Sequence, residues 1–114
     1  MPRIPADPVQ LSPAMHHILL ALLEGERHGY AIMQAVERIS DGATRMGPGT
    51  LYGAIKRLLD SGLVEETGER AEPGGDERRR YYRLSAVGRR TVIAETARLR
   101  RLVDFAGEHL QVAP

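Results

Sequence analysis

The sequence predicts a mainly helical fold that carries one β-hairpin, in the order helix, helix, helix, strand, strand, helix. Two observations predict this order. Apolar residues recur at helical spacing in four separate segments of the 114-residue chain, and serine or glycine beside proline marks the start of two of them. Between the third and fourth segments the pattern changes to two short stretches around a Pro-Gly-Gly-Asp turn, which is typical of a hairpin.

The first helix is expected to run from Ser12-Pro13 to about Glu24. Ser12 can cap the free amides of the first turn, Pro13 loses no hydrogen bond there, and Gly25 ends the helix. Its apolar face is broad and consists of Met15, Ile18, Leu19, Leu22 and Leu23. So broad a face predicts burial on two sides, against the core and against a second subunit. The preceding residues 1–11 contain three prolines and are expected to form a flexible arm.

The second helix is expected from about Gly29 to Ser40. The residues expected on its buried face are Tyr30, Met33, Val36 and Ile39. Tyr30 could contact a phosphate instead, but its spacing favours packing in the core.

The third helix is expected from Gly47-Pro48 to Asp60, with a narrow apolar stripe formed by Leu51, Ile55, Leu58 and Leu59. The opposite face of this helix has small side chains near its start and cationic side chains further along. It consists of Gly49, Thr50, Gly53, Lys56, Arg57 and Asp60. Because a glycine inside a helix costs about 1 kcal/mol relative to alanine, Gly53 indicates that another molecule comes close to the backbone there.

Residues 63–72 and 77–84 predict two strands joined by a long turn at 73–76. Ser85 is then expected to cap a final helix from Ala86 to about Leu110. The apolar residues of this helix repeat at spacings of seven, four, three and four, as in a coiled coil; they are Val92, Leu99, Val103, Ala106 and Leu110. In so short a chain, the expected cover of this stripe is a second copy, which predicts a homodimer.

Three helices followed by a hairpin are the parts of a winged helix-turn-helix, in which the second and third helices form the turn unit and the third enters the major groove of DNA. The predicted organisation is a DNA-binding domain at 12–84 and a C-terminal dimerisation helix and tail at 85–114.

The composition excludes several classes of protein and site. The chain has no cysteine, which excludes disulfides, thiolate metal sites and cysteine nucleophiles, and fits a reducing cytoplasm. No apolar run approaches the roughly 20 residues of a membrane span, and the N-terminal residues do not form a signal sequence. His16 and His17 are adjacent and make a poor chelate, and neither a catalytic triad nor a carboxylate pair stands out. We therefore expect a cytoplasmic protein that is not an enzyme and holds neither metal nor cofactor.

The net charge of +1 conceals two segments of opposite sign. Residues 78–101 contain nine arginines and one acid, whereas residues 58–77 contain one arginine and seven acids. Fifteen of the sixteen cationic residues are arginine, whose forked donors suit phosphate. A general preference of the sequence for arginine over lysine explains the same count equally well.

Four stretches resemble the PadR family of bacterial transcriptional regulators. They are ILLALLEGERHGYAI at 18–32, GPGTLYGAIKRLLDSGLV at 47–64, the Gly74-Gly75 turn with its RYYRL return at 80–84, and LSAVGRR at 84–90. The single C-terminal helix resembles the smaller of the family's two size classes. The resemblance implies a dimeric winged helix that represses promoters at a palindromic operator and often releases DNA when a small hydrophobic ligand binds.

The residues expected to contact DNA lie before and along the third helix and on the second strand of the wing. They are Arg45, Gly49, Thr50, Tyr52, Gly53, Lys56, Arg57, Arg78, Arg79 and Arg80. The first amides of the third helix form a phosphate site, and its cations can reach phosphates or guanine edges. Alternation along the strand places Arg78 and Arg80 on one face and Arg79 on the other.

Each of these assignments has an ordinary structural alternative. Tyr52 could be a core tyrosine with a solvated hydroxyl, and Lys56 and Arg57 could be a solvated pair. The wing arginines could pair with acids of the neighbouring strand, namely Glu65, Glu66 and Glu69. Tyr81 and Tyr82 point to opposite faces, so only one of them can pack inward.

The resemblance further implies an effector pocket at the dimer interface, between the first and last helices. The residues expected at this ligand or dimer interface are Met15, Leu19, Leu22, Val92, Leu99, Val103, Phe105, Ala106 and Leu110. The family members that stack flat drugs use a tryptophan, and this chain has none, so core or dimer packing is the alternative for these residues. The alternative function is a winged helix that binds an acidic protein through its arginine-rich wing.

Overall fold

The computed structural model describes residues 11–71 and 78–110. The expected arm at 1–11 lies outside this part except for its last residue, the wing turn at 73–76 lies wholly outside it, and the C-terminal tail lies outside it from residue 111.

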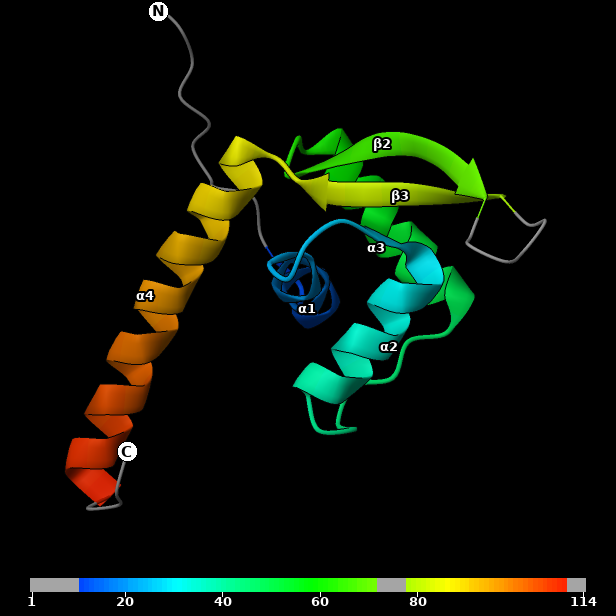
Figure 1. The fold of residues 1–114 in the computed structure, drawn as a ribbon. Coiled ribbons are helices and arrows are strands. Elements are labelled where there is room, and N and C mark those ends of the chain that lie inside the picture. The colour runs from blue at the N-terminus through cyan, green and yellow to red at the C-terminus, as the bar shows by residue number, and fades with distance from the viewer. Residues whose placement is uncertain (1–10, 72–77, 111–114) are drawn as a thin grey trace, which may run out of the picture.

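The elements follow in the order α1 (Pro13–Leu22), β1 (Arg27–His28), α2 (Gly29–Ile39), α3 (Pro48–Asp60), β2 (Val64–Ala71), β3 (Arg78–Leu84) and α4 (Ala86–Leu110). Figure 1 shows the three helices α1 to α3 below a twisted antiparallel hairpin, the wing, with α4 extending along one side. The predicted winged-helix class and its element order are confirmed. The two-residue strand β1 was not expected, because two residues are too few to show an alternating pattern.

Capping at the helix starts follows the sequence signals. The Met15 amide donates to the Ser12 hydroxyl at 3.1 Å, and Pro13 occupies the first helical position of α1. Pro48 does the same in α3, where Gly47 provides no side-chain cap. The helix α1 ends at Leu22, two residues earlier than expected, and the chain turns at Gly25 with a φ of +132°, which favours glycine.

Ser85 joins the start of α4 to the end of α3. Its hydroxyl accepts a hydrogen bond from the Gly88 amide at 2.9 Å and donates one to the Gly62 carbonyl at 2.6 Å. A Cβ atom at Gly88 would collide with the Leu63 carbonyl, so glycine allows α4 to pack directly on this backbone. The first turn of α4 is therefore fixed to the body of the molecule.

The sheet has the order β1-β3-β2, with antiparallel pairing throughout, so β3 is the central strand. Tyr82 lies opposite Arg27 of β1, and Arg80 lies opposite Glu69 of β2. A bulge interrupts the β2–β3 register between Glu66 and Gly68. Because β1 directly precedes α2, the central wing strand is hydrogen-bonded to the chain that leads into the helix-turn-helix.

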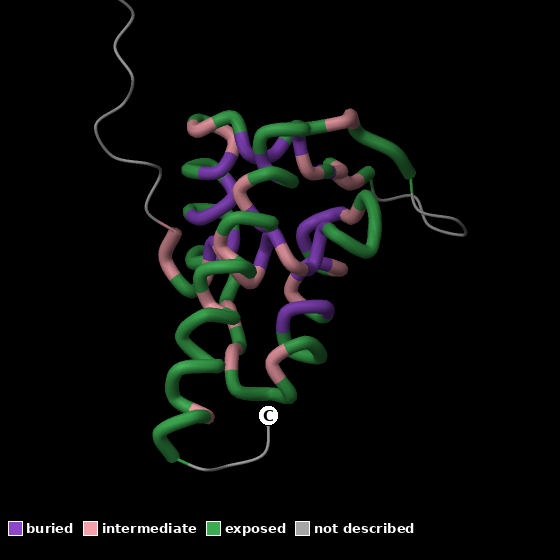
Figure 2. Tube along the Cα trace, turned by 90° about the vertical axis from the view of Figure 1, so that its left-hand side faces the viewer, coloured by how far each residue is buried: buried purple, intermediate pink, exposed green. Residues whose placement is uncertain are grey.

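The core lies where α1, α2 and α3 meet under the sheet, as the buried segments in Figure 2 show. Its largest fully buried side chains are Ile18, Leu19, Ile32, Val36, Leu51, Leu58 and Leu63. The predicted stripe of α3 is confirmed at Leu51, Ile55 and Leu58, and Leu59 is partly buried.

The expected buried face of α2 is wrong for two of its four residues. Tyr30 is 50% exposed and Ile39 is mostly outside the core, whereas Ile32 and Ala35 are buried beside Val36. The small residues Gly29 and Ala35 explain the difference. They let neighbouring elements pack closely on a face of α2 that carries few large apolar side chains, so apolar spacing did not identify it.

Only the first half of α4 belongs to this core. Val92 is buried and Leu99 is half-buried, and α4 packs there on α1 and β3. Beyond Leu99 nearly every residue of the helix is exposed, and Figure 2 shows this end projecting from the body.

Candidate nucleic-acid interface

The outer face of α3 is open to solvent along its whole length. It comprises Gly49, Thr50, Gly53, Lys56 and Arg57, all of which are exposed. A Cβ atom at Gly49 or Gly53 would meet no other atom within 4 Å, so the backbone here is accessible to a large partner. The amides of Gly49 and Thr50 belong to the first turn and lack intrahelical acceptors, which makes this end electropositive.

The two cations on this face differ in their partners. The Lys56 ammonium forms an exposed ion pair with Asp60 at 3.0 Å, one turn further along α3. Arg57 forms no ion pair with any residue in 11–71 or 78–110. An exposed pair of this kind stabilises the fold by little, so it leaves Lys56 available to exchange Asp60 for a phosphate.

Tyr52 lies beside the buried stripe of α3 with half of its surface exposed, which fits either sequence alternative, and its contact with DNA stays a prediction. Its ring packs against the first residue of α2, since a Cβ atom at Gly29 would collide with the Tyr52 hydroxyl. Gly29 therefore permits the close contact between the two helices of the turn unit. This contact holds the Tyr52 hydroxyl at the surface, between α2 and the wing.

The wing arginines use the acids of β2 only in part. Arg83 pairs with Glu65 at 3.1 Å, and the Arg80 guanidinium lies 4.0 Å from the Glu69 carboxylate. Arg78 donates to the Glu69 backbone carbonyl at 3.0 Å. The shorter of these two ion pairs thus involves an arginine outside the run at 78–80, and within that run Arg78 and Arg80 are exposed whereas Arg79 is partly buried.

Alternation along β3 places one tyrosine of the pair toward the helices and the other away from them. Tyr82 is only 4% exposed, whereas Tyr81 is partly exposed and lies under the Arg70 guanidinium, 4.0 Å from its ring centroid. Arg79 approaches the exposed ring of Tyr30, with 5.6 Å between guanidinium and centroid. One tyrosine of the pair packs inward, as expected.

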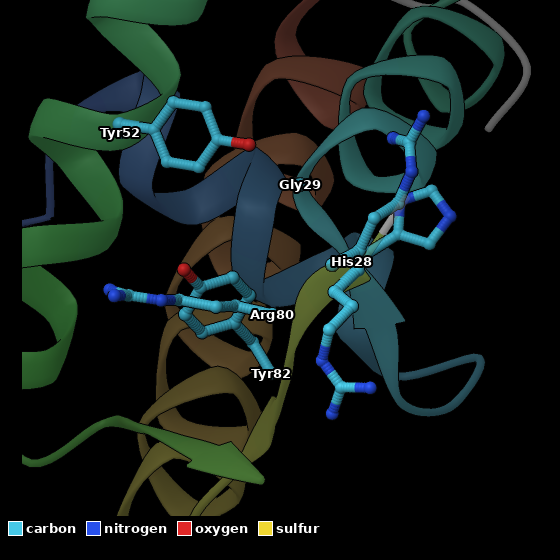
Figure 3. Close-up of a pocket in the computed structure, with 7 residues that line it drawn as sticks. His28, Gly29, Tyr52, Arg80 and Tyr82 are labelled. Carbon is cyan, nitrogen blue, oxygen red and sulfur yellow. The ribbon is translucent and has the colours of Figure 1, made fainter. Parts of the chain in front are cut away.

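A pocket of about 350 Å³ lies between the wing, α3 and the start of α2. Its lining residues are His28, Gly29, Tyr52, Arg78, Arg79, Arg80 and Tyr82. The structure thus brings Tyr52 of the third helix together with the wing arginines predicted for DNA (Figure 3). Sequence reasoning missed His28, Gly29 and Tyr82, because the pocket is assembled from three segments that are distant in the chain.

Arg45 lies apart from this arrangement of side chains. It is strongly exposed and pairs with Glu37 of α2 at 3.1 Å. This pairing makes it a component of the connection between α2 and α3.

The residues expected at a ligand or dimer interface differ in burial, and Leu99 is half-buried between a buried and an exposed group. The buried group lies in the core of a single chain and therefore cannot form an interface surface; it consists of Met15, Leu19, Leu22 and Val92. The exposed group is the apolar end of α4, which consists of Leu102, Val103, Phe105, Ala106 and Leu110. Leu102 was not among the expected residues, because it lies between the positions of the heptad-like repeat. Phe105 stacks on His109 with 4.1 Å between ring centroids.

The described residues contain neither a metal site nor a membrane-spanning helix. No group of three or more histidine, cysteine or acidic side chains in 11–71 and 78–110 is arranged to hold a metal ion. Within the same residues, no helix has the length and hydropathy that crossing a membrane requires.

Known proteins resemble this chain in sequence and in fold. An uncharacterized 37.1 kDa protein in transposon Tn4556 of Streptomyces fradiae is 39% identical over 85 residues, which cover 75% of this chain and 22% of the relative. The chain thus spans about a fifth of that relative's length. A PadR-like transcriptional regulator from Bacillus cereus superposes with a TM-score of 0.72 at 19% identity, covering 87% of this chain and 92% of the other.

A second solved structure contains DNA. It is Bacillus subtilis PadR in complex with operator DNA, with a TM-score of 0.63 at 19% identity over 74% of this chain and 46% of that one. The sequence model of the transcriptional regulator PadR-like family matches residues 18–94, which include the helix-turn-helix, the wing and the root of α4. Because this match covers more than half of the chain, the protein is a member of the PadR-like family of transcriptional regulators.

Proposed function

We propose that this protein regulates transcription by binding operator DNA as a homodimer, with α3 in the major groove and the wing on the adjacent backbone. The observation that carries the proposal is the outer face of α3, where exposed glycines are followed by two exposed cations. Gly49 and Gly53 let the groove approach, while Lys56 and Arg57 reach phosphates or guanine edges. The DNA complex of Bacillus subtilis PadR supports this use of the fold.

The remaining contacts are assigned to the start of α3 and to the wing. Thr50 and the first amides of α3 bind phosphate, Tyr52 adds its surface hydroxyl, and Arg78, Arg79 and Arg80 follow the backbone beside the groove. Arg45 is a flanking phosphate contact that would first have to leave Glu37.

Dimerisation is assigned to the C-terminal unit, residues 85–114, and DNA binding to residues 12–84. The apolar end of α4 has no cover within the described part of its own chain, and a second copy would bury it. Two-fold symmetry then places two α3 helices on a palindromic operator, with half-sites about 10 bp apart or a multiple of that spacing.

The family resemblance supports a repressor in the cytoplasm that releases DNA when a small hydrophobic ligand binds between the first and last helices. Leu99, Val103 and Phe105 would contact that ligand. The proposal includes neither a catalytic step nor a cofactor.

The test begins by selecting DNA fragments of the source genome that bind the protein, which yields the operator. Its affinity is then measured by gel shift at two salt concentrations, against a scrambled duplex. Lys56→Ala and Arg57→Ala should each weaken operator binding and reduce the salt slope by about one unit for a lost phosphate contact. Arg101→Ala, which removes an exposed arginine from α4, is the control for net charge.

Unchanged operator affinity in both α3 variants would refute the assignment of α3. Equally weak binding of operator and scrambled DNA by the unmodified protein would favour the alternative, an acidic protein partner bound by the wing.

A further inference from the structure

The pocket between the wing and α3 is lined by a tyrosine whose ring is buried and whose hydroxyl has no hydrogen-bond partner among the described residues. Tyr82 is 96% buried, yet it lines the pocket, and Figure 3 shows its hydroxyl directed into the space toward Tyr52. The hydroxyl is not among the buried, unpartnered polar atoms of the described residues, so it reaches the open space of the pocket although the ring is buried. It can therefore donate a hydrogen bond to a group that enters the pocket.

The Tyr82 hydroxyl is a donor at neutral pH. Burial raises the pKa of Tyr82, the nearby Glu66 and Tyr52 raise it further, and only Arg80 acts in the opposite direction. The phenol therefore keeps its proton, and the same electrostatic contacts place Tyr52 and Arg80 in its immediate surroundings.

Among the described residues, the rest of the lining is rich in donors and contains no carboxylate. Arg78, Arg79 and Arg80 all border the pocket, whereas Glu69, 4.0 Å from Arg80, and Glu66, whose charge acts on Tyr82, are not lining residues. Guanidinium groups and phenol hydroxyls together match the several acceptor oxygens of a tetrahedral oxyanion. A volume of about 350 Å³ accommodates a phosphate group with its ester substituent.

We propose that this pocket binds a phosphate group, with the hydroxyls of Tyr82 and Tyr52 and the guanidinium of Arg80 as its donors. The phosphate comes from the DNA backbone, which rests on the proposed function, or from a free phosphorylated molecule with the same chemistry. Since Tyr52 belongs to α3 and Tyr82 and Arg80 belong to β3, a bound phosphate connects the third helix to the wing. Tyr82 is thereby a binding residue as well as a core residue.

The first experiment uses inorganic phosphate and the full chain without DNA. Phosphate is titrated in a chloride buffer, and binding is followed by amide chemical shifts and calorimetry. The unmodified protein should bind phosphate saturably, and Tyr82→Phe should weaken binding about tenfold, the loss expected for one hydrogen bond to a charged group.

Tyr81→Phe is the matched control, because it removes the same atom from the next residue of β3, outside the pocket. Arg80→Ala, compared with Arg83→Ala, tests the charge contribution in the same way. Thermal melts of all variants establish that each is folded, and Tyr52→Phe gives a second test that leaves the core untouched.

The second experiment identifies the source of the phosphate. Single neutral methylphosphonate linkages are placed along the operator, and the loss of affinity at each is measured with the unmodified protein and with Tyr82→Phe. One linkage whose effect disappears in Tyr82→Phe identifies a DNA phosphate. Phosphate binding that depends on Tyr82, without such a linkage, identifies a free phosphorylated ligand.

The proposal is overturned if phosphate binding is absent or equal in Tyr82→Phe and Tyr81→Phe and if every linkage affects both proteins alike. The pocket then contains solvent only. If the protein still binds its operator specifically in that case, only the phosphate pocket is refuted and the proposed function is not. If phosphate binding depends on Tyr82 but the operator is not recognised, the proposed function is refuted and the pocket is not.

Discussion

At the scale of single residues, three glycines determine where the backbone can be approached closely. Gly53 gives up helix stability on a face where nothing in the described chain needs the space, while Gly29 and Gly88 are each required by a close contact. The open backbone at Gly53 was indicated by the sequence, since a glycine inside a helix costs stability, and its approach by DNA stays a prediction. The roles of Gly29 and Gly88 were not indicated, because their partners, Tyr52 and the Leu63 carbonyl, become neighbours only in the folded chain.

Gly53→Ala should therefore change stability and DNA binding in opposite directions. An added methyl group meets no protein atom, so unfolding measured by urea should show a gain of up to about 1 kcal/mol. The same methyl group lies on the outer face of α3 and should weaken operator affinity in a gel shift. A more stable variant with unchanged affinity would show that DNA does not approach the backbone at this position.

His16 makes the stability of the fold depend on pH. Burial lowers the pKa of His16 from its ordinary value of 6.5, Glu95 opposes the shift, and His17 and Arg98 add to it. Its Nε2 atom is buried and has no hydrogen-bond partner among the residues described. The unfolded chain therefore binds a proton more readily than the folded chain does at this position.

It follows that His16 lowers the free energy of unfolding as the pH falls below about 6.5, while at higher pH the histidine is neutral in both states. Urea unfolding between pH 5 and 8 should show this decline, and His16→Gln should make it shallower. An equally steep decline in the variant would assign the effect to other groups.

At the scale of elements, the sequence predicted the helices better than their faces. Pro48–Asp60 and Ala86–Leu110 agree with the expected bounds, because proline, serine and glycine mark both ends of α3 and the start of α4. The buried face of α2 was wrong at Tyr30 and Ile39, since apolar spacing allows two adjacent faces and only packing decides between them. The pocket could not be predicted, because it depends on the relative placement of α2, α3 and β3.

Ser85 should be the most sensitive cap in the molecule, because it serves two elements. Ser85→Ala removes the acceptor for the Gly88 amide and the donor to the Gly62 carbonyl, so thermal or urea unfolding should show a loss of about 1–2 kcal/mol. Thr91→Ala is the control, since its hydroxyl only bonds to the Val87 carbonyl within α4. Equal losses in both variants would contradict a joint between α3 and α4 at Ser85.

At the scale of the whole molecule, the helices α1 to α3 and the sheet bury their core within one chain, whereas the apolar end of α4 is exposed. Sequence reasoning marked this helix as a dimerisation element from its repeat, and the exposure of Val103, Phe105 and Leu110 supports the same proposal. The sequence could not distinguish these exposed residues from Met15, Leu19 and Leu22, which are equally apolar but are buried in the core.

Ala106→Glu and Ala97→Glu make a matched pair for testing the dimer. The two alanines are exposed and nine residues apart, which places them on opposite sides of α4. Ala106→Glu adds a charge among Leu102, Val103 and Leu110 and should dissociate the dimer in sedimentation experiments, whereas Ala97→Glu should leave it intact. A monomeric parent protein at working concentration would refute the homodimer.

The exposed end of α4 extends beyond the point at which the helix is held. Ser85, Gly88, Val92 and Leu99 hold the first half of α4 against the body, and the end from Leu99 to Leu110 is about 16 Å long. A tilt of about 5° in this end displaces its tip by about 1.4 Å. In a symmetric pair joined at these ends, a small molecule held between the two helices would change the spacing of the two DNA-binding domains without deforming either domain.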